Sequence, residues 1–211
     1  MALEKQVDKS HYQFGKYVGK NHRWVSFYHQ LDELFKLPNL SSVLEVGPGM
    51  PLVRDMLAYH APTVTYRSLD LAADLEPDVL GSVTRIPLED DSFDVVCAFQ
   101  ILEHIPYEEF ETALTEMARV SRGPVLISVP HFGPAFRLLL KIPMLPKIEV
   151  AQKIPYPIQH QWNGQHYWEI GKRGYPLRRI IQDMEKYFTL ERTYIPFENQ
   201  CHRFFVLRKK K

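Results

Sequence analysis

Two glycines and a carboxylate are spaced as in sites that bind a nucleoside. Gly47 and Gly49 lie on either side of Pro48, directly after the apolar run at residues 42–46, and Asp70 follows about 20 residues further on. Glycine lets the backbone pass close under a ligand, and a helix that follows such a turn offers N–H donors. A carboxylate at Asp70 can accept hydrogen bonds from both hydroxyls of a ribose. The spacing therefore predicts a nucleoside-containing cofactor, with a plain tight turn and a surface carboxylate as the structural alternative.

A dinucleotide-binding site would use the same kind of glycine turn. Its fingerprint needs a third glycine, which would fall at position 52, where this chain has Leu52. We therefore disfavour a nicotinamide dinucleotide as the cofactor.

Two histidines follow apolar runs and are placed to act on protons. His104 comes shortly after the run at residues 93–99, and His131 comes shortly after the run at residues 125–129. Because ligands bind at the carboxyl ends of the strands in an open α/β sheet, both side chains are expected at that edge. Imidazole titrates near neutral pH, which suits a general base. Either histidine is a candidate catalytic residue, and a role in orienting a loop is the alternative.

A cluster of polar and aromatic side chains between residues 159 and 169 suits a polyhydroxylated ring. Aromatic faces can stack on a sugar while amides, imidazoles and a carboxylate form hydrogen bonds with its hydroxyls. An arginine fork could bind a carboxylate or phosphate on the same molecule. The alternative is that the aromatic residues only anchor the loop. The predicted substrate-binding residues are His160, Trp162, His166, Tyr167, Trp168, Glu169 and Arg203.

The elements that must position these residues alternate between strands and helices. The strand-like runs are apolar on both faces, as interior parallel strands require, and the helical segments have apolar residues at helical spacing. Expected strands are residues 42–46, 64–69, 93–99, 125–129, 189–195 and 203–207. Expected helices are residues 24–35, 51–57, 108–120 and 176–188. The alternation predicts an α/β fold.

One long segment, residues 130–175, interrupts this alternation. It is rich in proline and aromatic residues, and connections of such length are usually functional or disordered. Within it, residues 134–148 are apolar but basic, which is compatible with a lid over the site or a peripheral contact with a membrane. Pro143 and Pro146 interrupt any long amphipathic helix there, which favours a lid or plain packing over a membrane contact. We expect one domain, residues 1–211, with 130–175 as a substrate-binding or lid insertion.

The composition disfavours several classes of protein. Lys plus Arg number 26 and Asp plus Glu 25, so no strong field recruits nucleic acid or an anionic membrane. Cys97 and Cys201 form no close pair, so neither a disulfide framework nor a metal site is expected. Residues 1–20 lack the apolar core of a signal peptide. No uninterrupted apolar stretch is long enough for a transmembrane segment. The basic end at residues 208–211 is expected to be solvated. These features predict a cytoplasmic protein with a small-molecule or glycan substrate and leave its oligomeric state open.

Four stretches of the chain occur in a specific order: residues 44–49, 69–70, 85–96 and 102–105, with the sequences LEVGPG, LD, RIPLEDDSFDVV and LEHI. This order resembles class I S-adenosylmethionine (SAM) dependent methyltransferases of the methyltransferase type 11 family. The resemblance spans residues 43–130. It implies SAM as cofactor and a Rossmann-like fold with a mostly parallel seven-stranded sheet and helices on both faces.

The resemblance also implies which residues contact SAM. The implied contacts are Glu45, Gly47 and Gly49 with the methionine part, Asp70 with the ribose, Leu71, Ser82 and Val83 with the adenine, and Gln100 beside the sulfonium. Two positions depart from the family pattern, because Pro51 replaces a common third glycine and Ser82 replaces an aspartate that often binds the adenine amine. A serine hydroxyl can still accept that hydrogen bond.

Methyl transfer from a sulfonium is an in-line displacement, so the protein must position the acceptor, exclude water and, for a hydroxyl, remove a proton. The sequences HYWEIG at 166–171 and HRFFVL at 202–207 are similar to those of bacterial members associated with cell-surface polysaccharides. We therefore expect O-methylation of a sugar or glycan hydroxyl. The alternatives are methylation of a small lipid or aromatic metabolite, and a catalytically inactive binding protein with the same fold.

Overall fold

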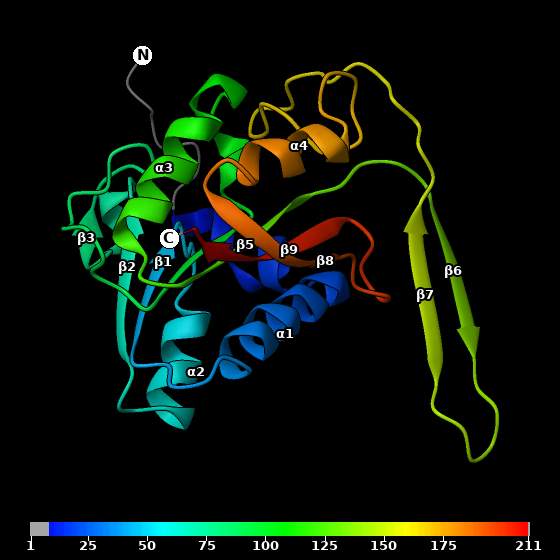
Figure 1. Ribbon diagram of the computed structural model, residues 1–211, viewed down its shortest axis with the longest axis horizontal. Helices are drawn as coiled ribbons and strands as arrows, with labels where there is room; N and C mark the ends of the chain where they lie inside the picture. Colours follow the sequence, from blue (N-terminus) through cyan, green and yellow to red (C-terminus); the bar gives the residue numbers. More distant parts are fainter. Residues whose placement is uncertain (1–8, 211) are drawn as a thin grey trace.

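A seven-stranded sheet forms the centre of the molecule in the computed structural model, which describes residues 9–210 (Figure 1). The strand order is β3-β2-β1-β4-β5-β9-β8, and within this sheet β9 alone runs antiparallel to its neighbours. The strands are β1 (Ser42–Val46), β2 (Thr65–Asp70), β3 (Val79–Leu80), β4 (Val95–Phe99), β5 (Pro124–Pro130), β8 (Phe188–Tyr194) and β9 (His202–Lys209). The predicted Rossmann-like α/β fold with a mostly parallel sheet is confirmed.

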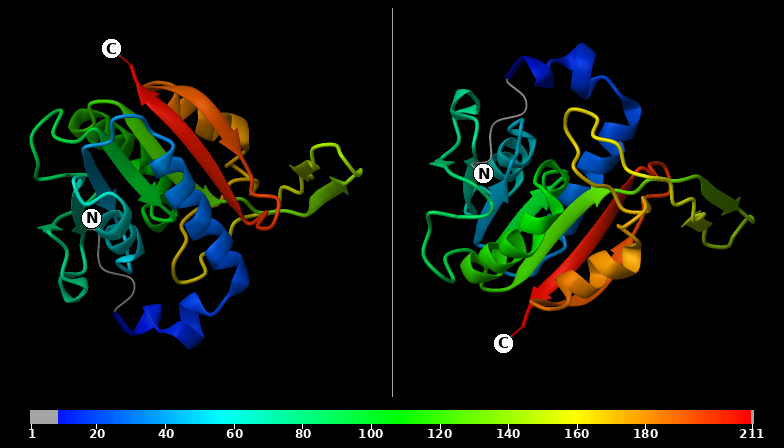
Figure 2. Two further views of the ribbon diagram at one scale, coloured as in Figure 1. Left: turned by 90° about the horizontal axis from the view of Figure 1, so that it is seen from below. Right: turned by 90° about the horizontal axis from the view of Figure 1, so that it is seen from above.

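Helices cover both faces of this sheet (Figure 2). The first pair, α1 (Asn21–Phe35) and α2 (Leu52–His60), packs on one face. The second pair, α3 (Phe110–Val120) and α4 (Leu177–Met184), packs on the other. Successive side chains of a strand point to opposite faces, so Val95 joins the core with α1 and α2 while its neighbour Val96 joins the core with α3 and α4. This two-sided burial explains why the strands are apolar at successive positions.

Short helical turns occur before α1 and after several strands. The segment before α1 contains η1 (Lys9–Tyr12) and η2 (Phe14–Val18), and the later turns are η3 (Ala73–Leu75), η4 (Leu102–His104) and η5 (Tyr107–Glu109). Residues 1–8 and Lys211 lie outside the described residues. The expectation that residues 1–20 are not a signal peptide and the expectation that residues 208–211 are solvated therefore fall partly on residues that the structure does not describe. Among residues 9–210, no helix has the length and apolar character needed to cross a bilayer.

The segment between β5 and α4 contains a hairpin that the sequence pattern did not predict. Strands β6 (Ala135–Leu140) and β7 (Ile148–Lys153) pair antiparallel as a separate two-stranded sheet. The hairpin projects away from the main sheet (Figures 1 and 2). Of its described residues, none between 135 and 152 lines the main cavity of the protein. Of residues 134–148, Pro134 lines that cavity and the others do not, so a lid over the site stays a prediction.

Candidate active site

The turn after β1 is shaped by its two glycines. Gly47 and Gly49 both have φ of +63°, in the left-handed region that glycine adopts without steric cost. A Cβ at Gly47 would lie 2.5 Å from the side chain of Ile101, and one at Gly49 would lie 2.4 Å from the ring of Tyr12. The backbone of this turn is therefore in close contact with two other segments, and no side chain fits between them.

Asp70 ends β2 beside this turn. Its Oδ1 accepts a hydrogen bond from the backbone N–H of Ala72 at 2.8 Å, which fixes the carboxylate at the end of the strand. The Ser82 hydroxyl accepts a hydrogen bond from the backbone N–H of Thr84 at 3.1 Å, so it also shapes the turn that carries it. The residues expected beside the adenine line the same cavity as Asp70: Leu71, Ser82 and Val83.

Glu45 and Gln100 reach this cavity from β1 and from the end of β4. The buried carboxylate of Glu45 accepts a hydrogen bond from the Tyr66 hydroxyl at 2.6 Å. Burial raises the pKa of Glu45 to about 7, although that hydrogen bond acts in the opposite direction. Gln100 has a φ of +57°, and its side-chain amide donates to the Ser128 hydroxyl at 3.1 Å. Sparsely populated backbone conformations of this kind concentrate at functional sites.

A single cavity of about 680 Å³ brings together all eight predicted cofactor residues. This volume lies within the range of about 300–1,000 Å³ found for small-molecule sites. The N-terminal segment and α1 add Tyr12, Tyr17 and Arg23 to the wall, with the guanidinium of Arg23 at 3.6 Å from the centre of the Tyr17 ring. The sequence analysis missed these three residues, because scattered aromatic residues in a polar segment produce no periodic signal.

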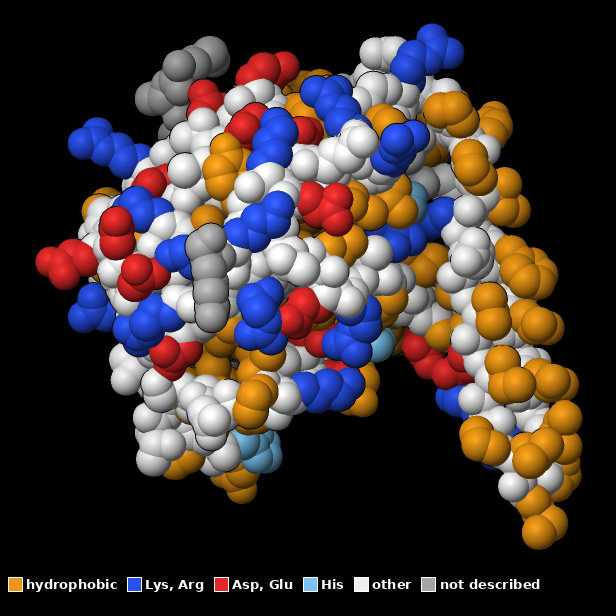
Figure 3. All heavy atoms as spheres, in the orientation of Figure 1, with side chains coloured by type: hydrophobic (Ala, Val, Ile, Leu, Met, Phe, Trp, Pro, Cys, Tyr) orange, Lys and Arg blue, Asp and Glu red, His pale blue; other side chains and the backbone are white. Residues whose placement is uncertain are grey.

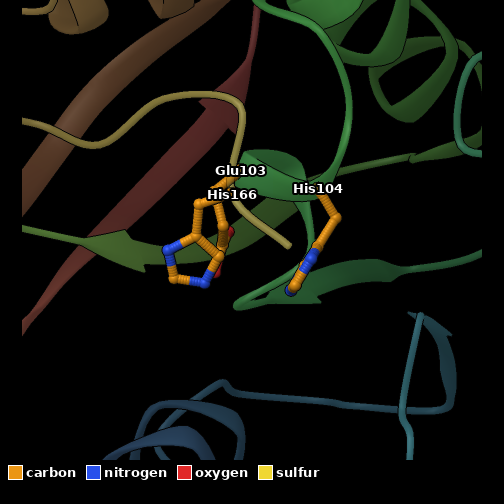
Figure 4. Close-up of side chains that lie close together, drawn as sticks. All are labelled: Glu103, His104 and His166. Atoms are coloured by element: carbon orange, nitrogen blue, oxygen red, sulfur yellow. The ribbon is translucent and has the colours of Figure 1, made fainter. Parts of the chain in front are cut away.

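Three ionisable side chains meet in the same cavity (Figure 4). Glu103 and His104 belong to η4, directly after β4, whereas His166 comes from the loop between β7 and α4. One ligand atom from each of the three residues lies within 4.8 Å of the other two. Two hydrogen bonds join the segments: the Tyr167 N–H donates to the Glu103 carbonyl at 2.8 Å, and His104 Nδ1 lies 3.1 Å from the Gln165 carbonyl oxygen. These bonds hold the loop in register with η4.

Burial sets the direction of the pKa shift at Glu103 and His104, but not at His166. It raises the pKa of Glu103 to about 7. It also lowers the pKa of His104 to about 4, with a further contribution from the charge of His166. Burial alone would lower the pKa of His166, but the hydrogen bond to Glu169 and the charge of Glu103 outweigh it and raise that pKa. Glu103 lies in the LEHI motif but was not among the predicted site residues, because its burial beside two imidazoles is a tertiary property.

His131 lines the cavity as predicted, but it contacts a cation. Its Nδ1 accepts a hydrogen bond from Arg203 Nε at 2.9 Å. Burial, together with the charge of Arg203, lowers the pKa of His131 to about 3. Arg203 also donates to the Thr193 hydroxyl at 3.1 Å, and burial lowers the pKa of Arg203 to about 10. Arg203 does not line the described cavity, so it supports His131 rather than contacting substrate as expected.

Five of the six remaining predicted substrate residues divide between two cavities. His166 and Glu169 line the main cavity, where His166 Nδ1 lies 2.8 Å from Glu169 Oε1. A second, outer cavity of about 340 Å³ is lined by the other three, together with two arginines: His160, Trp162, Tyr167, Arg173 and Arg179. His166 lines the main cavity and the next residue, Tyr167, lines the outer one, so consecutive residues contribute to the two cavities.

Trp168 is a core residue. Its exposed fraction is 0%, and its ring packs edge-on against Tyr107 and Phe110 with ring centres 5.1 Å apart in both cases. The expectation that Trp168 contacts substrate is therefore wrong. The aromatic content of the loop did not indicate which of its rings anchors it to the domain.

Several known proteins share features with this chain. Residues 44–126 match the family model of a methyltransferase domain. A SAM-dependent methyltransferase from Aquifex aeolicus is 14% identical, with a TM-score of 0.62 over 97% of this chain and 100% of that chain. A protein from Pyrococcus horikoshii is 13% identical, with a TM-score of 0.62 over 97% of this chain and 100% of that chain.

A third similar structure contains a bound ligand pair. It is 1,6-didemethyltoxoflavin-N1-methyltransferase from Burkholderia thailandensis, solved with 1,6-didemethyltoxoflavin and S-adenosylhomocysteine (SAH). It is 16% identical, with a TM-score of 0.63 over 96% of this chain and 85% of that chain. No curated protein sequence matches the chain.

The fold, the glycine turn and the matched domain together define the class of this protein. Residues 44–126 form a methyltransferase domain, and the chain shares its fold with SAM-dependent methyltransferases. The residues present fit SAM, because the glycine turn lines one cavity of about 680 Å³ together with Asp70 at the end of the neighbouring strand.

Proposed function

We propose that the protein transfers the methyl group of SAM to a hydroxyl group of a sugar or glycan. The observation that carries this proposal is the presence of Glu103, His104 and His166 in the same cavity as the glycine turn. A hydroxyl is a weak nucleophile until its proton is removed. A buried carboxylate beside two imidazoles supplies the kind of groups that this step needs.

When bound, SAM supplies an electrophilic methyl group attached to a sulfonium. The acceptor loses the proton of its O–H group, a bond forms between its oxygen and the methyl carbon, and SAH leaves. We assign the loss of the proton to the cluster that contains His104. His131 has a positioning role, because its Nδ1 already accepts a hydrogen bond from Arg203. Tyr12 and Tyr17 exclude water from the cofactor side by covering the glycine turn and part of the wall.

The outer cavity supports a sugar as the acceptor. The rings of Trp162 and Tyr167 are 4.5 Å apart between their centres, and both are partly exposed. Arg173 and Arg179 line the same cavity. Partly exposed aromatic rings stack on sugar faces, and guanidinium groups bind carboxylates or phosphates. An acidic sugar or a nucleotide sugar therefore fits this surface, and the adjoining main cavity holds the reacting hydroxyl.

The setting that we propose is the assembly of a cell-surface polysaccharide at a step that takes place in the cytoplasm. This setting extends the expectation drawn from the sequences at residues 166–171 and 202–207. A nucleotide-linked or growing glycan would present hydroxyls to this site before export.

The hairpin favours a second candidate, an acceptor that is carried by a membrane. Large apolar side chains are exposed on it, and they cover much of its visible surface (Figure 3): Phe136, Leu138, Leu139, Leu140, Ile142, Met144, Leu145 and Ile148. Cross-strand partners share a face, so one face of the hairpin is apolar, with Leu138, Leu140 and Val150, whereas Arg137, Glu149 and Lys153 lie on the other. An apolar face beside basic residues suits contact with a lipid surface, although Lys147 also pairs with Glu149 at 2.8 Å. A lipid-linked glycan or a quinone-like molecule is the acceptor in this case.

The acceptor class is tested by incubating the purified protein with methyl-labelled SAM and three panels of acceptors. The panels are nucleotide sugars, polysaccharide fragments, and quinones or lipid-linked glycans. We expect one methyl group on a sugar oxygen, located by mass spectrometry and NMR. Labelling of the quinone, or of a nitrogen atom, would reject the sugar hydroxyl as the acceptor.

A further inference from the structure

Glu103 carries a carboxylate that has no partner in the described part of the chain. Its exposed fraction is 1%, and neither of its oxygens makes a hydrogen bond with residues 9–210. Burial of a carboxylate in this state is unfavourable, and proteins retain such groups where a ligand completes their bonding. Glu103 faces the cavity that also contains His104 and His166. The two carboxylate oxygens without hydrogen-bond donors therefore lie beside the two imidazoles.

Both imidazoles are oriented by hydrogen bonds at Nδ1. His104 Nδ1 lies 3.1 Å from the carbonyl oxygen of Gln165, which can only accept, so this nitrogen carries the ring proton. His166 Nδ1 lies 2.8 Å from the carboxylate of Glu169, which has the same effect. In the neutral form of each ring, the lone pair is consequently on Nε2. Metal-binding histidines are held in this way, with a carbonyl or carboxylate on the second ring nitrogen.

We infer that Glu103, His104 and His166 together bind a divalent first-row metal ion. Their ligand atoms already lie within 4.8 Å of one another. Small side-chain rotations bring such atoms to the metal bond lengths of about 2.0–2.2 Å that Zn²⁺ sites show. Two imidazoles and one carboxylate suit Zn²⁺ or Mn²⁺, whereas Mg²⁺ prefers oxygen ligands. Three protein ligands leave further coordination positions for a substrate oxygen.

The sequence analysis expected no metal, because it relied on the lack of paired cysteines. The ligands inferred from the structure come from two segments that are far apart in the chain. They are brought together by the hydrogen bonds of Gln165 and Tyr167 to η4. This juxtaposition is a tertiary property that the spacing of residues did not reveal.

The role of the ion rests on the proposed function. A bound cation lowers the pKa of a coordinated hydroxyl. The acceptor oxygen then loses its proton to water and forms the bond to the methyl carbon, while the bond between that carbon and sulfur breaks to leave SAH. His104 is a ligand in this scheme, and the cation takes over the activation of the hydroxyl.

Metal binding is tested on the full chain after treatment with a chelator, without any acceptor. We expect Zn²⁺ and Mn²⁺ to bind with one ion per chain in titration calorimetry. Glu103→Gln and His166→Ala should lose saturable binding, and Glu169→Gln should weaken it by about 10–100-fold, as for other residues that orient a metal-binding histidine. His60→Ala is the matched control, because His60 is exposed at the end of α2, and it should bind as the wild type does.

A spectroscopic measurement on the wild-type protein avoids any loss of folding in the variants. Bound Mn²⁺ should show coupling to imidazole nitrogen in electron spin echo experiments. No cation binding, equal affinity in Glu103→Gln, or bound Mn²⁺ without nitrogen coupling would each overturn the metal site. SAH affinity is measured in parallel: if the wild type binds SAH but no cation, the metal site fails and the methyltransferase proposal stands, whereas no SAH binding overturns the proposed function itself.

Discussion

Arg203 donates a hydrogen bond from Nε to Nδ1 of His131 at 2.9 Å. A guanidinium group can only donate, so Nδ1 of His131 is the acceptor and its ring proton is on Nε2. His104 has the opposite arrangement, because the Gln165 carbonyl accepts from its Nδ1. The two histidines at the same edge of the sheet therefore carry their lone pairs on different nitrogens. Protonation of His131 would break its bond with Arg203.

This difference predicts unequal effects of removing the two histidines. His104→Ala should lower kcat by about 100-fold or more, because it removes a member of the cluster that activates the hydroxyl. His131→Ala should lower kcat by less than about tenfold, because it removes a positioning contact and leaves that cluster intact. Steady-state kinetics at saturating SAM, together with SAH affinity, measures both effects. Similar losses in the two variants would show that the assignment of roles is mistaken.

Gly49 should not tolerate a side chain. Gly49→Ala places a Cβ 2.4 Å from the Tyr12 ring and forces a non-glycine residue into a φ of +63°. We expect a loss of about 1–2 kcal/mol in the free energy of unfolding from the backbone alone, together with weaker SAH binding. Gly15→Ala is the control, because a Cβ at Gly15 meets nothing within 4 Å. Chemical denaturation and calorimetry that show no difference between the variants would argue against the close-packed turn.

His202 should make the protein sensitive to acid. Burial, followed by the charge of Arg23, lowers its pKa from 6.5 to about 3, and its Nδ1 lies 2.7 Å from the Ser26 hydroxyl. Below pH 6.5 the unfolded chain takes up a proton that the folded protein does not. Stability from this group is therefore present above pH 6.5 and is lost as the pH falls towards 3, by up to about 1.4 kcal/mol per pH unit.

The measurement for His202 is denaturant unfolding at a series of pH values from about 7 to about 5. His202→Gln can keep a hydrogen bond to Ser26 without titrating. Its free energy of unfolding should fall less steeply with acid than that of the wild type. Parallel curves for the two proteins would mean that His202 titrates normally in the folded state.

The hairpin should bind lipid through its tip. Met144→Ser combined with Leu145→Ser removes two exposed apolar side chains and should lower affinity for vesicles of anionic phosphatidylglycerol by at least about tenfold. SAH affinity should stay unchanged, because neither residue lines the cavity. Tyr59→Ser is the matched control, since Tyr59 is an exposed aromatic residue on α2. Failure of the wild type to sediment with vesicles, or dimerisation through the hairpin instead, would rule out a membrane contact.

The cofactor half of the molecule could be predicted from sequence because its signals are local. All residues of β4 and three of the five in β1 are apolar, since each strand is buried on both faces. The glycines after β1 report a backbone conformation that other residues avoid. The short β3 was missed because two residues are too few to show a pattern.

The region expected to bind the methyl acceptor, residues 103–104 and 130–175, could not be predicted in the same way. The burial and exposure of its side chains arise from contacts between segments that are distant in the sequence. The burial of Glu103 beside His166 depends on how the long loop returns to η4. The same loop buries Trp168 and leaves Trp162 exposed, although both are tryptophans in one polar stretch. In the hairpin, the consecutive apolar residues 138–140 resemble a buried element in the sequence, yet the structure exposes them.

The central claim is that one pocket, formed by the glycine turn and Asp70, binds the adenosyl group. Titration calorimetry of SAH with the wild type, Asp70→Ala and Asp55→Ala tests it directly. Asp55 is an exposed carboxylate on α2 that pairs with Arg54 at 3.0 Å, so it controls for the loss of charge. We expect one SAH per chain in the wild type and in Asp55→Ala, and affinity lower by about 100-fold or more in Asp70→Ala, because two hydrogen bonds to a charged group are lost. Equal affinity in Asp70→Ala and the wild type, or no SAH binding by the wild type, would contradict the account.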